Sequence, residues 1–432
     1  MKRKKVLDAV RKYIENEPEP KFVPGETSIR TAGSSWDADD VVALVDVALG
    51  RWYAGGRVAY EFEKFMATAT GQRYVTLCNS GSSANLLALS CLMSKRLKER
   101  ALKRGDEVIT VAAGFPTTVN PIVQNGLIPV FVDINLPGYN ALPNAVSEAI
   151  SDKTKAIMIA HTLGNPYRAK EIREIADQND LFVIGDCCDS LGSEHHGQPL
   201  PYWADLSTFS FFPAHHISMG EGGCVSTNDS LLDSILRSFR DWGRACFCKV
   251  GVNNTCGKRY GWKLGDLPLG FDHKFIYSEI GYNLKATDLQ AALGVSQLKK
   301  LPKFTEIRRD NWKFYHENLS EFKQHLILPE PTAYSSPSPF GFVLSVKENS
   351  PFTRTELVSF LDQNKIDSRM LFAGNLIRHP AYKDVKYRVS GTLHKSDFVA
   401  EHTFWIGVFP GITRPMQNYV VEKFAEFVKR YK

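Results

Sequence analysis

The 432-residue sequence lacks several features that mark special classes of protein. No apolar run reaches the roughly 18 residues that cross a bilayer, and the basic start at residues 1–12 has no adjoining apolar segment of the kind found in secretory signals. Internal repeats and low-complexity segments are also missing. These features argue against a membrane partner and predict a cytoplasmic location.

A strong excess of charge is missing as well. The net charge is only +6, and lysine and arginine are spread along the chain instead of forming one basic stripe. We therefore expect no nucleic-acid partner, and we interpret the basic cluster at residues 94–104 as the solvated face of a helix. A mildly basic surface would still suit an anionic, phosphate-bearing substrate.

Eight cysteines are present, and a reducing location makes disulfides an unlikely use for them. Metal binding is then the first alternative to simple burial. Cys78, Cys91 and Cys224 lie in apolar surroundings and are predicted to be core residues.

From residue 71 onward, short apolar runs alternate with amphipathic helical segments. This pattern is typical of an α/β fold in which helices cover a mostly parallel sheet. Helices are expected at residues 83–100, 167–179 and 286–301, where apolar residues recur at three- and four-residue spacing. Seven strands are predicted at residues 74–78, 107–111, 128–134, 155–161, 181–186, 206–212 and 223–228.

A change in composition marks a boundary after this core. A charged helix near residues 304–322 is followed by a Pro/Ser-rich stretch, and strand-like and helical segments then alternate to the end of the chain. We predict a large cofactor-binding domain at 51–301 and a smaller C-terminal α+β domain at 302–432. Residues 1–50 are expected to form an N-terminal segment that packs near the small domain.

Two places in the core suggest a cofactor pocket. Gly81, Ser82 and Ser83 follow a strand and open a helix, where free backbone N–H groups and the helix dipole can bind a phosphate. Taken alone this is a weak signal, because serine at such a position is more often a simple helix cap. Asp186 ends a buried strand, where its carboxylate could hold the protonated ring nitrogen of a pyridoxal-type cofactor or could cap the next turn.

Two further residues fit the same pocket. Phe115 follows a strand and could lay its ring on a flat cofactor, although an ordinary core aromatic is the simpler interpretation. Asn283 precedes an amphipathic helix, where it is an N-cap by default.

The order of these motifs resembles the sugar-aminotransferase branch of the fold-type I pyridoxal-phosphate enzymes, the DegT/DnrJ/EryC1/StrS group. The match covers residues 30 to 430 and includes FSFFPAHH at 209–216 and GYNLKATDLQAALG at 281–294. The resemblance implies that Ser210 joins the glycine and two serines of 81–83 at the cofactor phosphate, that Phe115 stacks on the ring, and that Asp186 pairs with the ring nitrogen. It also implies a homodimer in which Asn283 reaches the partner's phosphate.

The sequence departs from this pattern at two positions. Relatives that transaminate have a lysine where this chain has His215, and imidazole cannot tether the cofactor aldehyde covalently. We therefore expect the amine form, pyridoxamine phosphate, with His215 acting as the general base and His216 as a bystander. Asp189 replaces the Gln or His often found at its position, so its contact with the cofactor's phenolic oxygen is open.

Four cysteines indicate a metal centre. Cys188, Cys246, Cys248 and Cys256 follow the pattern C-x57-C-x-C-x7-C, which suits either tetrahedral zinc or an iron–sulfur cluster. Paired C-x2-C knuckles, common in structural zinc sites, do not occur here, and Cys188 lies two residues beyond Asp186, close to the expected cofactor. We therefore prefer iron–sulfur, with neighbouring Cys187 buried and unligated.

With both features, the chain resembles the 3-dehydrases of 3,6-dideoxyhexose biosynthesis, which use pyridoxamine phosphate and a 2Fe-2S cluster. The resemblance implies removal of the C3 hydroxyl from a CDP-linked 4-keto-6-deoxyhexose in O-antigen and lipopolysaccharide biosynthesis. An NADH-dependent flavin and iron–sulfur reductase would supply the electrons. The turns at 161–165 and 375–380 are candidates for binding the nucleotide.

Three alternatives stay open. A cluster-free 3-dehydratase recycled by glutamate would share the histidine without needing the cysteines. A nucleotide-sugar aminotransferase would share the fold, although the missing lysine argues against it. A non-catalytic, zinc-stabilised regulator would keep only the scaffold.

Overall fold

The computed structural model describes residues 2–18, 21–248 and 252–431. Its centre is an eight-stranded sheet with the order β1-β9-β8-β5-β4-β2-β3-β14, in which β9 runs antiparallel to both neighbours and the other pairings are parallel. All seven predicted strands are present, so the mostly parallel α/β fold is confirmed. The strands are β1 (Tyr74–Cys78), β2 (Glu107–Val111), β3 (Ile128–Val132), β4 (Thr154–Ala160), β5 (Phe182–Asp186), β8 (Leu206–Ser210), β9 (Gly223–Thr227) and β14 (Arg388–Val389).

Helices cover both faces of the sheet because both faces of its strands are apolar. In β4, Ala156 and Met158 join the cluster that contains side chains of α4 and α8, whereas Ile157 and Ile159 join the cluster that contains side chains of α6 and α7. This alternation follows from the two-residue repeat of a strand. The helices of this region are α3 (Arg57–Thr70), α4 (Gly81–Leu92), α5 (Pro116–Gln124), α6 (Pro143–Glu148), α7 (Ala169–Gln178), α8 (Ser230–Arg240) and α9 (Asp288–Leu298).

The C-terminal part has its own antiparallel sheet, with the order β10-β12-β15-β13, and a separate apolar core. Phe342, Phe404 and Phe424 are fully buried there. Its strands are β10 (Leu326–Ile327), β12 (Gly341–Val346), β13 (Arg369–Met370) and β15 (Thr403–Gly407), and its helices are α10 (Leu301–Asn318), α11 (Arg354–Gln363), α12 (His394–His402) and α13 (Arg414–Lys429). A third, small sheet joins β6 (Glu194–His195), β7 (Gln198–Pro199) and β11 (Ser335–Ser336).

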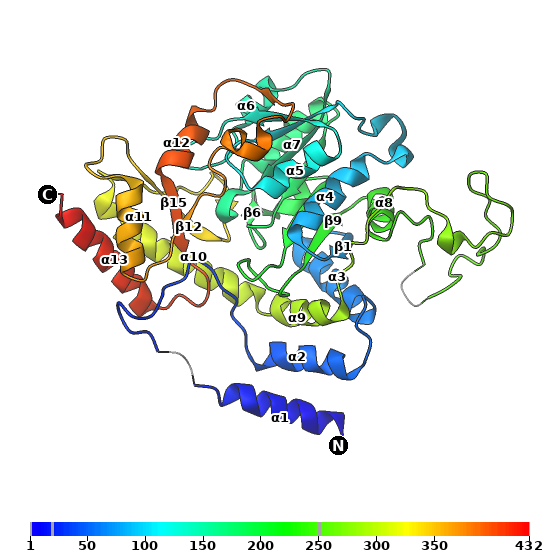
Figure 1. Ribbon diagram of the computed structural model, residues 1–432, viewed down its shortest axis with the longest axis horizontal. Helices are drawn as coiled ribbons and strands as arrows, with labels where there is room; N and C mark the ends of the chain where they lie inside the picture. Colours follow the sequence, from blue (N-terminus) through cyan, green and yellow to red (C-terminus); the bar gives the residue numbers. More distant parts are fainter. Residues whose placement is uncertain (1, 19–20, 249–251, 432) are drawn as a thin grey trace.

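The N-terminal segment contacts both parts of the molecule. Helix α2 (Ala38–Leu49) packs on α9 and on α1 (Arg3–Glu15), which lies at the edge of the molecule in Figure 1. In the segment that links α1 to α2, Ile29 pairs with Ile366 and is buried in the C-terminal core. The domain boundaries at 50 and 301 stay a prediction.

Two details differ from the sequence prediction. The helix expected at 83–100 ends at Leu92, because the Ser94 hydroxyl accepts a hydrogen bond from the Arg96 N–H and starts a separate 3-10 segment, Lys95–Arg100. Strand β14 was not predicted. It joins the sheet beside β3, and the Arg388 guanidinium binds the Glu107 carboxylate at 2.7 Å.

Across the described ranges, no helix is both long enough and apolar enough to span a bilayer. The cytoplasmic location stays a prediction.

We predict that Asp288→Ala lowers the free energy of unfolding by about 2 kcal/mol, because three buried backbone donors lose their acceptor. The Asp288 carboxylate is 3% exposed and accepts hydrogen bonds from the N–H groups of Gly56, Val58 and Ala59 at the start of α3. Urea unfolding measures the change. Asp229→Ala removes the exposed N-cap of α8 and should lower the free energy of unfolding by about 1 kcal/mol or less. Equal losses in the two variants would contradict the expectation that burial makes the Asp288 hydrogen bonds more stabilising.

Candidate active site

A cavity of about 790 Å³ opens at the carboxyl edge of the central sheet. The last residues of four strands line it: Val111 of β2, Ala160 of β4, Asp186 of β5 and Ser210 of β8. Parallel strands bring their carboxyl ends to one edge, which is where open α/β folds bind ligands. The cavity also has the size of a pocket for a cofactor or small molecule.

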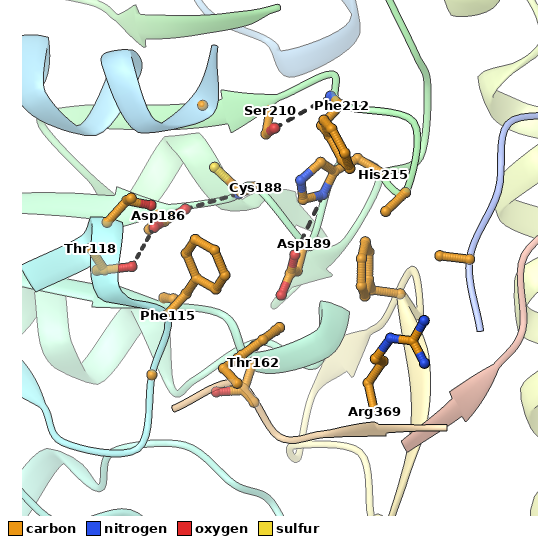
Figure 2. Close-up of a pocket in the computed structure, with 18 of the residues that line it drawn as sticks. Phe115, Thr118, Thr162, Asp186, Cys188, Asp189, Ser210, Phe212, His215 and Arg369 are labelled. Atoms are coloured by element: carbon orange, nitrogen blue, oxygen red, sulfur yellow. Dashed lines mark hydrogen bonds and ion pairs between the residues drawn. The ribbon is translucent and has the colours of Figure 1, made fainter. Parts of the chain in front are cut away.

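Asp186 is the most tightly held polar group of the cavity. Its carboxylate accepts a hydrogen bond from the Asn85 amide at 2.8 Å. It also accepts hydrogen bonds from the Thr118 hydroxyl at 2.7 Å and the Cys188 N–H at 3.0 Å (Figure 2). The Thr208 hydroxyl in turn donates to the Asn85 side-chain oxygen at 2.6 Å. The carboxylate is therefore fixed in position toward the cavity. Sequence analysis missed its partners, because Asn85 and Thr118 carry no signal beyond lying in the first turns of helices that follow strands.

Gly81 and Ser82 begin α4 and line the cavity beside Ser210. Gly81 leaves room that a larger residue would fill: a Cβ there would meet the Ser210 hydroxyl oxygen at 2.8 Å and the Cys188 Sγ at 3.1 Å. Ser83 does not line the cavity. Its N–H donates to the hydroxyl of Ser80, the N-cap residue of α4, so Ser83 takes part in capping the helix.

His215 also lines the cavity, and its Nδ1 lies 3.5 Å from the Asp189 carboxyl oxygen Oδ1 (Figure 2). Burial lowers the pKa of His215 to about 3, and the Arg308 guanidinium adds to this effect. Burial, and then the Asp186 carboxylate, raise the pKa of Asp189 to about 8. At neutral pH the imidazole is therefore neutral and Asp189 mostly retains its proton, so their contact is not an ion pair.

Arg308 fixes the backbone beneath His215. It lies on α10, is 1% exposed, and donates from Nη2 to the His215 carbonyl oxygen at 3.1 Å and from Nη1 to the Pro339 and Phe340 carbonyls. Neighbouring His216 faces away, with its Nε2 2.8 Å from the Ser338 carbonyl oxygen. The distinction between the two histidines was predicted from the sequence, whereas Arg308, 93 residues along the chain, carried no signal.

The outer part of the cavity is largely apolar. Phe115 is half exposed and contacts the Phe372 ring edge-to-face with 5.7 Å between centroids. The C-terminal part adds Phe340, Arg369 and Trp405 to the wall, none of which sequence analysis identified. Figure 2 shows the Phe115 ring directed into the space near Asp186 and Asp189, with Arg369 on the far side of the view from Ser210.

Three other predicted positions contribute little to the cavity. Asn283 is exposed, lies outside it, and accepts a hydrogen bond from Lys285 Nζ at 2.6 Å; the N-cap of α9 is Thr287 instead. From the turn at 161–165 only Thr162 lines the cavity. The turn at 375–380, which is fully described, supplies no lining residue.

The four predicted metal ligands do not meet at one point in the described part of the chain. Cys188 lines the cavity, whereas Cys246 and Cys248 belong to the loop that follows α8 and extends from the side opposite the C-terminal helices (Figure 1). The ligand atoms of Cys246, Cys248 and His273 lie within 4.8 Å of one another, and Cys256 Sγ is 4.0 Å from His273 Nε2. Cys188 does not belong to this group of neighbouring ligand atoms among the described residues, and the four-cysteine centre stays a prediction.

His273 was missed by sequence analysis, because an isolated histidine has no spacing that relates it to the cysteines. It is 2% exposed, and its Nδ1 lies 3.3 Å from the Lys258 carbonyl oxygen. An Nδ1–H that donates to this carbonyl leaves the Nε2 lone pair free to face the thiols, the usual arrangement of a metal-ligating histidine. The remaining cysteines, Cys78, Cys91, Cys187 and Cys224, are buried as predicted.

The fold and the cavity together define a fold-type I, aminotransferase-like protein: a mostly parallel sheet with its site at the carboxyl edge, completed by a C-terminal antiparallel sheet. The sequence profile of the DegT/DnrJ/EryC1/StrS aminotransferase family matches residues 35–425. The chain belongs to this family.

Relatives match over nearly the whole chain. The dTDP-4-dehydro-2,6-dideoxy-D-glucose 3-dehydratase of Saccharopolyspora spinosa is 52% identical, covering 99% of this chain and 92% of the relative. The lipopolysaccharide biosynthesis protein RfbH of Salmonella typhimurium is 50% identical, covering 98% of each. The E. coli GDP-4-keto-6-deoxy-D-mannose-3-dehydratase with bound hydrated PLP superposes with a TM-score of 0.83 at 29% identity, covering 92% of this chain and 99% of that structure.

The grouping of donors on the cysteine loop predicts binding of one thiophilic metal ion. We expect the metal-free protein to bind Co²⁺ with a sulfur-to-cobalt charge-transfer band, and Cys248→Ser or His273→Ala to weaken binding at least roughly tenfold. Cys188→Ser is the matched control and should bind as the wild type does. Equal loss in Cys188→Ser would show that this thiol joins the loop when metal binds, as the four-cysteine prediction requires.

Proposed function

We propose that the protein is a pyridoxamine-phosphate-dependent 3-dehydratase that removes the C3 hydroxyl of a nucleotide-linked 4-keto-6-deoxyhexose in deoxysugar biosynthesis. The main observation behind this proposal is that His215 lies in the cavity with Asp186, at the position where transaminating relatives have a lysine. Three relatives named as sugar 3-dehydratases or as a lipopolysaccharide biosynthesis protein support the substrate class; the third, from Yersinia pseudotuberculosis, is 34% identical over 87% of the chain.

The residues of the cavity fit this cofactor. Gly81, Ser82 and Ser210 form a small-residue cradle at a helix N-terminus that suits its phosphate, and Asp186 suits its ring nitrogen. Phe115 is placed to cover a flat ring. When bound, pyridoxamine phosphate supplies an amine that condenses with the sugar ketone and a conjugated ring that delocalises negative charge.

We propose that His215 acts as the general base of the reaction. Because burial keeps its imidazole neutral at physiological pH, the ring has a free lone pair that can accept a proton. Arg308 holds the backbone of His215, and the apolar wall keeps water from competing. Asp189 retains a proton at neutral pH and lies beside the imidazole, so it can supply that proton to the departing C3 hydroxyl, which leaves as water.

We also propose which nucleotide the substrate carries and how two copies of the chain assemble. CDP is proposed on the resemblance, whereas two of the relatives are named for a dTDP-linked and a GDP-linked sugar. A homodimer in which Asn283 contributes to the partner's cavity agrees with the exposure of Asn283 and of several large apolar side chains nearby, including Trp242, Tyr277 and Ile280.

A reductive version of the reaction would add a 2Fe-2S cluster and an NADH-dependent flavin and iron–sulfur reductase. Its ligands would be Cys188, Cys246, Cys248 and Cys256, and the three loop cysteines lie close enough to His273 to support a metal centre. Because Cys188 lies apart from them in this structure, we assign no electron-transfer step to the cluster.

A cluster-free 3-dehydratase recycled by glutamate is the second candidate, favoured by this separation of Cys188 from the loop. Iron content and visible absorption of the purified protein distinguish the two. A nucleotide-sugar aminotransferase is disfavoured, since the cavity presents His215 instead of a lysine.

We predict that His215→Asn lowers the dehydration rate at least roughly 100-fold, because general-base catalysis is worth about that factor or more. The assay incubates the full chain with pyridoxamine phosphate and a nucleotide-linked 4-keto-6-deoxyhexose and follows loss of one water by mass spectrometry. His216→Asn, checked for folding by circular dichroism, should retain most activity.

His215→Lys offers a second readout. It should become covalently labelled by pyridoxal phosphate after borohydride reduction, while the wild type should not be labelled at this position. If neither the wild type nor any variant releases water from CDP-, dTDP- or GDP-linked substrates, the dehydratase proposal is wrong.

We predict that Gly81→Ala weakens pyridoxamine phosphate binding at least roughly tenfold, since its methyl group would collide with Ser210 in the phosphate cradle. Fluorescence titration measures the affinity. Gly261→Ala is the control, because a Cβ there meets no atom closer than 3.8 Å. Unchanged affinity in Gly81→Ala would place the phosphate elsewhere.

A further inference from the structure

Arg369 is the one lysine or arginine among the described residues that line the cavity. The other ionisable groups there are Asp186, Asp189 and His215 together with the Cys188 thiol, and none of them carries a positive charge at neutral pH by the pKa arguments given above for His215. An anionic part of a ligand in the outer cavity therefore has a single side-chain cation available to it. No role was predicted for this residue from the sequence.

The Arg369 guanidinium has no carboxylate partner within the described ranges. Its one hydrogen bond runs from Nη1 to the adjacent Ser368 carbonyl oxygen at 2.7 Å. Two other arginines of the C-terminal part do have carboxylate partners: Arg378 binds Asp397 at 2.8 Å and Arg388 binds Glu107 at 2.7 Å. Arg369 thus keeps most of its five N–H donors free for a ligand.

The base of the Arg369 side chain is held firmly. Arg369 pairs with Trp405 in the antiparallel β13–β15 ladder, and the Trp405 indole N–H donates to the neighbouring Met370 carbonyl oxygen at 3.2 Å. Trp405 and Phe340 line the same wall, with 5.3 Å between their ring centroids. An anion bound against these rings would be partly shielded from water, which strengthens a charge-assisted hydrogen bond.

The position of Arg369 separates it from the phosphate cradle. In Figure 2, Arg369 and Ser210 lie at opposite sides of the cavity, with Asp189 and His215 between them. A cavity of about 790 Å³ has room for a cofactor at the inner end and a second ligand at the outer end. A group bound to Arg369 would therefore belong to the substrate, with its reacting end directed toward His215.

We propose that Arg369 binds the diphosphate of the nucleotide-sugar substrate and thereby orients the sugar toward His215. This inference rests on the proposed function for the substrate class. A planar guanidinium matches the geometry of phosphate oxygens, and a diphosphate offers it several acceptors. The same chemistry would also suit the carboxylate of an amino-acid donor such as glutamate, which the experiment distinguishes.

The test measures binding of CDP, dTDP and GDP to the full chain loaded with pyridoxamine phosphate, by calorimetry. For the tightest of the three, Arg369→Gln should raise Kd roughly 10- to 100-fold, as expected for a charge-assisted contact, and Arg369→Lys should lie in between. Arg378→Gln is the matched control, because this exposed arginine binds Asp397 and lies outside the cavity lining. In turnover, Arg369→Gln should raise KM far more than it lowers kcat.

Equal nucleotide affinity in the wild type and Arg369→Gln would overturn the inference while leaving the dehydratase proposal intact. A variant that binds nucleotide normally but loses saturation by glutamate would overturn the diphosphate assignment in favour of the carboxylate. A wild type that binds none of the three nucleotides would overturn both the inference and the nucleotide-sugar part of the proposed function.

Discussion

The hydrogen-bonded carboxylate of Asp186 is the constraint on which the rest of the site depends. Its three donors come from different parts of the chain: the side chains of Asn85 on α4 and Thr118 on α5, and the backbone of Cys188 beyond β5. A buried carboxylate is costly unless its oxygens are paired, so these elements can only be assembled in one relative position. The same arrangement places the start of α4 beside Ser210 and so shapes the small-residue cradle.

The contact between His215 and Asp189 depends on burial, which keeps both side chains uncharged. His215 and Asp189 lie in contact, and removal from water favours the neutral form of each. Buried Arg308 lies near both groups, yet it uses its hydrogen bonds on carbonyl oxygens and not on Asp189. At neutral pH both groups are therefore uncharged, Asp189 with its carboxyl proton and His215 with one free lone pair, which suits proton movement better than a fixed ion pair would.

Sequence analysis identified the parts of the fold and site that follow from local pattern. The strands were visible as short apolar runs, and the parallel order placed Gly81, Asp186, Ser210 and His215 at one edge. It missed Arg308, which holds the backbone of His215, and Arg369, which lines the cavity, because each is placed by contacts between segments far apart in the chain, for which the sequence has no periodic signal. The four-cysteine centre stays a prediction: Cys188 lines the cavity beyond Asp186, whereas Cys246 and Cys248 group with His273 on a loop, and spacing along the chain does not determine how far apart such segments lie.

Strand β14 belongs to the C-terminal stretch of the chain but completes the edge of the central sheet. In the other sheet, β13 and β15 supply Arg369 and Trp405 to the cavity wall. The C-terminal region therefore contacts the core in two ways, through the β14–β3 pairing and through the residues that it adds to the cavity wall. A hinge motion of the whole C-terminal region away from the core would break the hydrogen bonds between β14 and β3, so movement of the side chains that line the cavity is the less costly way to admit a large ligand.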